Sequence, residues 1–381
     1  MSCTMSQSNC EWKECKLGDV INFGNGKVRP KTEGLIPVYG GNGVMDYCDD
    51  SNYDGETIII GRVGAYCGSV FYKNGSIWVS DNALAAKPKN NNNAKYLFYF
   101  LKEIKLNQLA EGSSHPLITQ TLLNSIDVMI PEDANEQKAI ASVLSSLDDK
   151  IDLLHRQNKT LEVMAETLFR QWFASPELVK GEEAGEGWEE KPLGDYVSVV
   201  DNRGKTPPNT EIPTPYPVIE VNALGERLVN YSVIRKYVDE KTYTSWFRNE
   251  LQKFDTLIST VGSIGAISMF IIESGNIAQN VVGFHPKDVS PFFIYQILKY
   301  KADELTQLDI GGVQPSIKVP HLLSMLIPVP PKEIQNKFDD QVKCFVEKME
   351  NNYKQIRTLE KLRDNLLPKL MSGEVRVLNH D

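Results

Sequence analysis

Four consecutive residues, Arg203-Gly204-Lys205-Thr206, have the residue types of a phosphate-binding loop. Such a loop has the form G-x-x-x-x-G-K-[ST] between a strand and a helix, because its glycines let backbone amides surround the phosphates. Here Val199 occupies the position of the first glycine, and two prolines follow Thr206 where a helix should begin. We therefore do not expect this stretch to bind a nucleotide.

Other catalytic patterns are also incomplete. The segment FGNG at 23–26 resembles the glycine loop of a methyl-donor site, but no N-P-P-[FYW] or D-P-P-[FYW] tetrapeptide follows it. The tripeptide Glu103-Ile104-Lys105 has the E-x-K form of a nuclease fragment, within an amphipathic helical pattern. The five histidines lack metal-ligand spacing, and there is no G-x-S-x-G motif. We expect a binding protein that has no catalytic residue, metal or cofactor of its own.

Composition sets broad limits on the class of protein. The 381 residues suffice for two or three domains, and the 41% hydrophobic and 24% charged content is that of a globular protein. The sequence lacks a signal-peptide pattern and an apolar run of about 20 residues, and its six cysteines are scattered, which favours a cytoplasmic location. The net charge of −9 disfavours unaided nucleic-acid binding, although a local basic patch is compatible with it.

An internal repeat organises the chain. The matched segments are LGDV from Leu17 and LGDY from Leu193, IIIGRVGAYCGSV from Ile58 and LISTVGSIGAISM from Leu257, SDNALAAKPK from Ser80 and AQNVVGFHPK from Ala278, and PLITQTLLNSIDVMIP (116–131) and PSIKVPHLLSMLIPVP (315–330). The offset grows from 176 residues to about 199 because the second copy carries insertions. A period this long indicates a duplicated domain rather than a solenoid.

Each copy combines short β-branched runs with one amphipathic helix and is followed by a long helical pattern. We predict an α+β protein in which two similar mixed α/β domains are separated by an antiparallel two-helix coiled coil. The expected order is a first domain at 1–131, a long helix at 132–175, a linker at 176–187, a second domain at 188–330, and a second long helix with the C-terminal segment at 331–381.

Both long helices carry five-heptad seams with one central asparagine each. If they pair antiparallel, positions whose numbers add to 510 face each other. The predicted layers are Asn158 with Asn352, Leu154 with Ile356, and Leu161 with Met349. Such a coil would be roughly 50 Å long and would act as a spacer. The alternative is that each helix packs only on its own domain. Arg363, opposite Leu147, and Pro368, which should end or kink the helix, depart from the pattern.

A basic pair occurs at the same place in both copies. Lys27 and Arg29 follow Leu17 by ten and twelve residues, and Arg203 and Lys205 follow Leu193 by the same distances. Side chains at i and i+2 of an extended segment share a face, which favours contact with DNA over two isolated solvated charges. The further predicted DNA contacts, all in loops, are Lys31, Arg62, Asn82, Thr260, Asn280 and Gln314.

The chain resembles the specificity subunit of a type I restriction-modification enzyme over nearly its whole length. The residues that carry the resemblance are IPEDANEQKAIASVLSSLDDKIDLL, LEVMAETLFRQWF, IPVPPKEIQ, LLPKLMSGEVRV and the GKTPP loop; EIQNKF departs from an expected E-Q pair. The resemblance implies that the chain reads a bipartite, asymmetric double-stranded DNA target. It also implies two modification (adenine methyltransferase) subunits and motor-nuclease restriction subunits as partners.

Two alternatives to this function remain. The chain could serve a related enzyme in which methyltransferase and nuclease share one polypeptide, or it could be a coiled-coil scaffold or regulator that binds protein rather than DNA.

Overall fold

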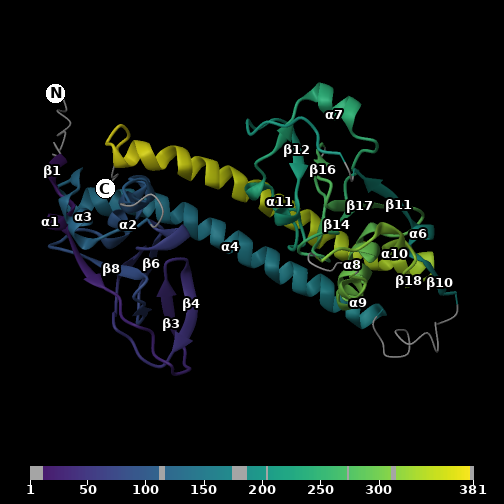
Figure 1. The fold of residues 1–381 in the computed structure, drawn as a ribbon, viewed down its shortest axis with the longest axis horizontal. Helices are drawn as coiled ribbons and strands as arrows, with labels where there is room; N and C mark the ends of the chain where they lie inside the picture. The colour runs from purple at the N-terminus through teal and green to yellow at the C-terminus, as the bar shows by residue number, and fades with distance from the viewer. Residues whose placement is uncertain are drawn as a thin grey trace, which may run out of the picture. The chain divides into compact units, whose positions relative to one another are not determined.

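The computed structural model describes residues 12–110, 116–173, 187–202, 205–272, 274–309 and 315–377. The chain forms two compact units, one of Met1–Asp152 with Thr358–Asp381 and one of Leu153–Arg357. The long helices α4 (Ala134–Phe173) and α11 (Lys332–Met371) each contribute to both units (Figure 1). Among the described residues, no helix has the length and apolar character needed to cross a membrane.

The first unit holds three small sheets. They are the antiparallel pair β1 (Trp12–Lys16) and β9 (Asp127–Pro131); the four strands in order β2 (Ile21–Asn25), β8 (Ala83–Pro88), β5 (Thr57–Gly61) and β6 (Val70–Lys73); and the three strands β4 (Gly43–Cys48), β3 (Ile36–Gly40) and β7 (Trp78–Val79). The helices are α1 (Leu17–Val20), α2 (Ala94–Glu103) and α3 (Gln120–Ser125).

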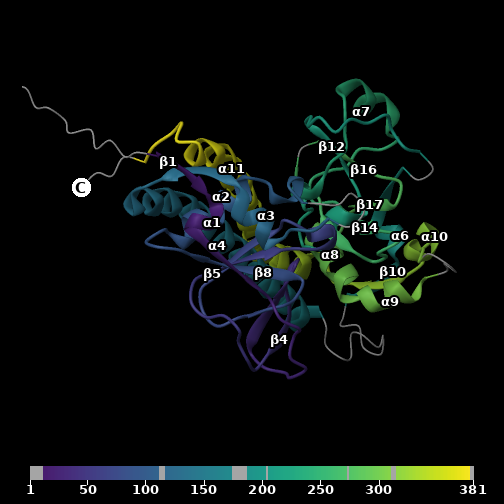
Figure 2. The ribbon, with the colours of Figure 1, turned by 60° about the vertical axis from the view of Figure 1, so that its left-hand side comes forward.

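The second unit repeats this arrangement. Its sheets are β10 (Glu189–Pro192) with β18 (Leu326–Val329); β11 (Val197–Asp201), β17 (Val281–Pro286), β14 (Thr256–Ser259) and β15 (Ile267–Met269); and β13 (Tyr237–Val238), β12 (Tyr216–Ile219) and β16 (Asn276–Ile277). The helices are α6 (Leu193–Tyr196), α7 (Glu240–Trp246), α8 (Pro291–Tyr300), α9 (Ala302–Gln307) and α10 (Val319–Leu323). The matching strand orders confirm the predicted pair of similar mixed α/β domains. In the three-stranded sheets, β3 runs parallel to β7 as β12 does to β16. The strands β12 and β16 are labelled in both views (Figures 1 and 2).

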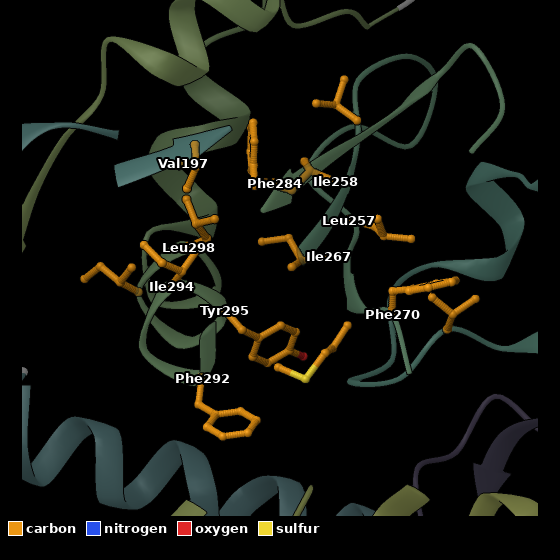
Figure 3. Close-up of a cluster of buried hydrophobic side chains, with 14 of the residues drawn as sticks. Val197, Leu257, Ile258, Ile267, Phe270, Phe284, Phe292, Ile294, Tyr295 and Leu298 are labelled. Carbon is orange, nitrogen blue, oxygen red and sulfur yellow. The ribbon is translucent and has the colours of Figure 1, made fainter. Parts of the chain in front are cut away.

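The second unit has a continuous apolar core between its four-stranded sheet and α8 (Figure 3). Leu257, Ile258 and Phe284 from the sheet are completely buried, as is Tyr295 from α8. Phe169, near the end of α4, joins the same cluster. Burial of apolar surface stabilises by about 25 cal/mol per Å², so this shared cluster anchors the domain to the long helix.

Contacts between α4 and α11 show antiparallel pairing within each unit. In the second unit, Asn352 Nδ2 donates to Asn158 Oδ1 at 2.9 Å, so the two amides meet as the register predicts. In the first unit, Arg363 Nη1 donates to Asp148 Oδ1 at 2.8 Å, at positions that add to 511. The flanking side chain of Leu154 is 1% exposed, which places it in the seam.

The two residues that interrupt the heptad pattern are accommodated without ending the pairing. Arg363 lies between Asp148 and Asp364 rather than against an apolar residue. Asp148 also accepts a hydrogen bond from Tyr99 Oη at 2.7 Å, and burial together with that bond raises the pKa of Tyr99. Helix α11 continues through Pro368 and ends three residues later, at Met371.

Each domain is held to the first turn of the long helix that follows it by one glutamine. Gln137 Oε1 accepts from Asn93 N at 2.8 Å, and its Nε2 donates to Pro131 O at 2.9 Å. Gln335 Oε1 accepts from Ser290 N at 2.8 Å, and its Nε2 donates to the carbonyl of Pro330 at 2.8 Å. The segment EIQNKF therefore keeps the glutamine in its place, despite its departure from the E-Q pair.

Candidate DNA interface

The turn after β7 and the turn after β16 occupy equivalent places in the two domains. Arg62 N donates to Asn82 O at 3.1 Å, and Thr260 N donates to Asn280 O at 2.9 Å. These bonds make Arg62 the counterpart of Thr260 and Asn82 the counterpart of Asn280. One backbone framework thus presents different side chains in the two domains.

The two counterparts beside the turns differ in accessibility. Arg62 is partly exposed, and its Nε has no hydrogen-bond partner in the described part of the chain. Thr260 has no exposed surface, and its hydroxyl donates to Asn280 O at 3.2 Å. The DNA contact predicted for Thr260 stays a prediction, and the complete burial of its side chain disfavours it.

In the first domain, the predicted basic stretch passes beside this turn. Lys27 N donates to Val79 O at 3.0 Å, and the Lys27 side chain is exposed. Arg29 is exposed but forms an ion pair with Asp46 of β4, so its charge is partly compensated within the domain. Lys31 is exposed. Of these three basic residues, Lys27 is the one whose backbone pairs with the strand end that leads into the turn carrying Asn82.

In the second domain, only part of the predicted basic stretch can be placed. Lys205 N donates to Asn202 O at 3.3 Å, and the Lys205 ammonium lies 5.9 Å from the centre of the Trp246 ring. Arg203 lies outside the described residues, as does Gln314. The loop at 111–115 in the first domain lies outside them as well.

Lys205 and Asn280 line one pocket of about 330 Å³ in the second domain. Its walls also include Asn222, Lys236 and Gln279. Two lysines and a single carboxylate line it, and that carboxylate, Glu220, accepts from the Lys236 ammonium at 2.7 Å. The pocket therefore offers local positive charge and amide groups on a chain of net charge −9.

Sequence reasoning did not predict Asn222 or Lys236. Asn222 follows β12 as Asn42 follows β3. The two positions are equivalent because the carbonyl of Ile219 accepts a hydrogen bond from the residue after β16, and the carbonyl of Tyr39 accepts one from the residue after β7. The pair VYGGN and VIEVN carries this signal, but it is only five residues long. Lys236 lies in the insertion of the second copy and has no counterpart to align with.

Two similar domains with polar loops, joined to a pair of long helices, are the architecture of a two-domain recognition protein. No cluster of His, Cys, Asp or Glu suited to a metal ion occurs among the described residues.

Residues 9–163 and 185–361 match the family described as Type I restriction modification DNA specificity domain. The chain belongs to this family: it is a non-catalytic specificity subunit, whose role is DNA sequence recognition.

Known relatives agree with this assignment. The chain is 30% identical over 311 residues to the type I restriction enzyme MjaIX specificity subunit of Methanocaldococcus jannaschii, covering 76% of this chain and 71% of that protein. It is 25% identical to the MjaVIII specificity subunit of the same organism, covering 97% and 94%. The crystal structure of a type I restriction-modification S subunit from M. genitalium has the same fold, with a TM-score of 0.64 and 20% identity over 96% of this chain and 97% of that one.

Proposed function

We propose that each domain reads one half of a bipartite, asymmetric target in double-stranded DNA. The observation that carries this proposal is the shared hydrogen-bond framework with unlike side chains. Arg62 corresponds to Thr260, and Asp81 precedes Asn82 where Gln279 precedes Asn280. Because donors and acceptors at the loop tips select bases, domains with different tips select different half-sites.

The long helices are proposed to recruit two modification subunits, which transfer the methyl group to adenine, and through them the restriction subunits. In the second unit, Leu153, Val163 and Met164 of α4 are 39%, 54% and 44% exposed. Leu153 and Leu161 also line an open groove of about 450 Å³. Exposed apolar side chains on a helix pair suit docking by another protein, and a basic partner would supply phosphate contacts that a chain of net charge −9 lacks.

The coiled coil is proposed to set the number of base pairs between the two half-sites, as dimer geometry does for other DNA-binding proteins. The contact between Asn158 and the completely buried Asn352 supports this role, because a polar layer in a coil fixes its register. We assign this activity to the cytoplasm, where the scattered thiols would remain reduced.

Mapping N6-methyladenine across the host genome, with and without this gene, tests the proposal. Deletion should remove methylation at one motif with two unlike half-sites, and re-expression should restore it. If the lost motif is a single unbroken or palindromic sequence, the assignment of one half-site to each domain is wrong. If the methylome does not change, capture of the chain's binding partners would show whether it acts as a protein scaffold.

A further inference from the structure

Three side-chain amides around the pocket of the second domain have no partner within the domain. They belong to Asn222, Gln279 and Asn280, and in the part of the chain that the structure describes no hydrogen bond engages them. Five other asparagines of this domain do use their amides in such bonds: Asn202, Asn209, Asn230, Asn249 and Asn276. Among the described asparagines of this domain's sheets and loops, the two without such a bond, Asn222 and Asn280, thus line the same pocket, together with Gln279.

Rigid elements position these amides. Strands β12 and β16 are parallel neighbours, with Ile219 opposite Ile277, so their carboxyl ends emerge side by side (Figures 1 and 2). The turn after β12 is closed by a bond from Ala223 N to Glu220 O at 3.0 Å, and the turn after β16 by one from Val281 N to Ala278 O at 3.1 Å. A site built on strand ends holds its polar groups more precisely than a free loop does.

The chemistry of these groups matches one base in particular. A side-chain amide presents a donor and an acceptor side by side, and the major-groove edge of adenine presents the N6 donor beside the N7 acceptor. Lys205 and Lys236 line the same pocket; because Glu220 holds the Lys236 ammonium, Lys205 is the cation available to a phosphate flanking a bound base.

We infer that this pocket is the base-reading site of the second domain, and that its amides recognise the major-groove edge of an adenine in one half-site. The inference rests on the proposed function and deepens it by naming the base and the residues.

The first domain has the same framework with a different lining. Asn42 follows β3 as Asn222 follows β12, and Asp81 and Asn82 stand where Gln279 and Asn280 stand. A carboxylate only accepts hydrogen bonds, so Asp81 suits the N4 donor of cytosine rather than the mixed edge of adenine. The two half-sites should therefore differ at this contact.

The test uses the specificity subunit assembled with its modification subunits and a duplex carrying the methylated motif. Each adenine of the motif is replaced in turn by 7-deazaadenine, which lacks the N7 acceptor, and binding is measured by fluorescence anisotropy. At one position of one half-site we expect the wild-type complex to lose roughly 5- to 150-fold in affinity. Asn222→Ala and Asn280→Ala complexes should bind the natural duplex more weakly and should be insensitive to that replacement.

Two matched controls separate base reading from general effects. Lys287, directly after β17 and so at its opposite end from Asn280, is exposed, and Asn351 is exposed on α11. Lys287→Ala and Asn351→Ala complexes should keep the wild-type response to 7-deazaadenine.

The possible outcomes are distinguishable. If Asn222→Ala and Asn280→Ala weaken binding equally on all sequences, or have no effect, the pocket does not read a base, while a bipartite motif for the wild type would still support the proposed function. If the wild-type complex selects no bipartite motif, the inference and the proposed function fail together.

Discussion

At the scale of single residues, the asparagine layer of the coil is asymmetric. Asn352 is completely buried, whereas Asn158 is partly exposed, and Asn352 Nδ2 points at two acceptors, Asn158 Oδ1 at 2.9 Å and Gln157 Oε1 at 3.4 Å. Asn352→Asp removes the donors and buries a carboxylate against those oxygens. We expect it to lower the free energy of unfolding by roughly 3–5 kcal/mol at neutral pH, measured by urea denaturation.

The neighbouring residue supplies the control for that substitution. Asn351 is exposed on the same helix, so Asn351→Asp should change stability by less than about 0.5 kcal/mol. Equal destabilisation by the changes at 351 and 352 would contradict a buried polar layer.

Glu350 gives the second unit a pH-dependent contact between domain and helix. Burial opposes its ionisation, but hydrogen bonds from Lys354 at 2.7 Å and Lys253 at 3.1 Å outweigh burial and lower the pKa of Glu350 from 4.5. A carboxyl whose pKa is lower in the folded state stabilises the fold above its unfolded pKa, and this contribution is lost as the pH falls through the folded pKa.

Glu350→Gln should therefore lower the melting temperature at pH 7, and its difference from wild type should shrink as the pH falls below 4.5. Thermal denaturation followed at several pH values measures this. Glu347, which is 53% exposed on the same helix, is the control, and Glu347→Gln should have little effect at any pH. If the melting temperature of Glu350→Gln stays below that of wild type by the same amount down to the lowest pH, lost packing rather than lost charge causes the difference.

At the scale of elements, the two glutamines join each domain to its helix by the same pair of bonds. Gln335 is 3% exposed, and Gln335→Ala would leave the Ser290 amide and the Pro330 carbonyl buried without partners. Each such loss costs about 1–3 kcal/mol. We expect Gln335→Ala to destabilise the protein by roughly 2–5 kcal/mol and to speed amide exchange at the start of α8, measured by hydrogen–deuterium exchange.

Gln341 is exposed on the same helix and serves as the matched position. Gln341→Ala should leave exchange at the start of α8 unchanged. If both substitutions produce the same exchange pattern, Gln335 does not hold the domain to the first turn of α11.

The elements that the sequence predicted are those with long, locally consistent signals. The two heptad seams predicted the pair of long helices. The long matched segments predicted the duplicated domain and the equivalence of Asn82 with Asn280. The burial of Thr260 could not be read from the sequence, because it is set by packing around the end of β14. The partner of Arg363 was missed because Asp148 is offset by one residue from the heptad position.

The pocket of the second domain illustrates why a site is harder to predict than a fold. Lys205, Asn222, Lys236 and Asn280 come from four segments that are brought together by the parallel pairing of β12 with β16 and by an insertion. A periodic pattern cannot report such a convergence, because each contributing segment is short and polar. The basic pair Arg203 and Lys205 and the corresponding pair Lys27 and Arg29 could be found only because the repeat supplied two copies to compare.

At the scale of the whole molecule, the duplication predicts that the two domains act on separate half-sites. Lys27 and Lys205 are both exposed, so Lys27→Glu and Lys205→Glu should each weaken binding of the assembled complex to its motif. If each lysine contacts one phosphate, the slope of log Kobs against log salt should fall by about 0.9 per change, and the double variant should lose the sum. Each single variant should differ from wild type in its tolerance of mismatches in one half-site and should match wild type in the other.

The controls are Lys73 and Lys287, which are exposed lysines at the ends of β6 and β17 away from the turns that carry Asn82 and Asn280. Reversal of either lysine to Glu should leave the slope unchanged. A scaffold that binds only protein would show no salt-dependent DNA affinity to alter, and loss of both half-sites on one single reversal would contradict independent reading by two domains.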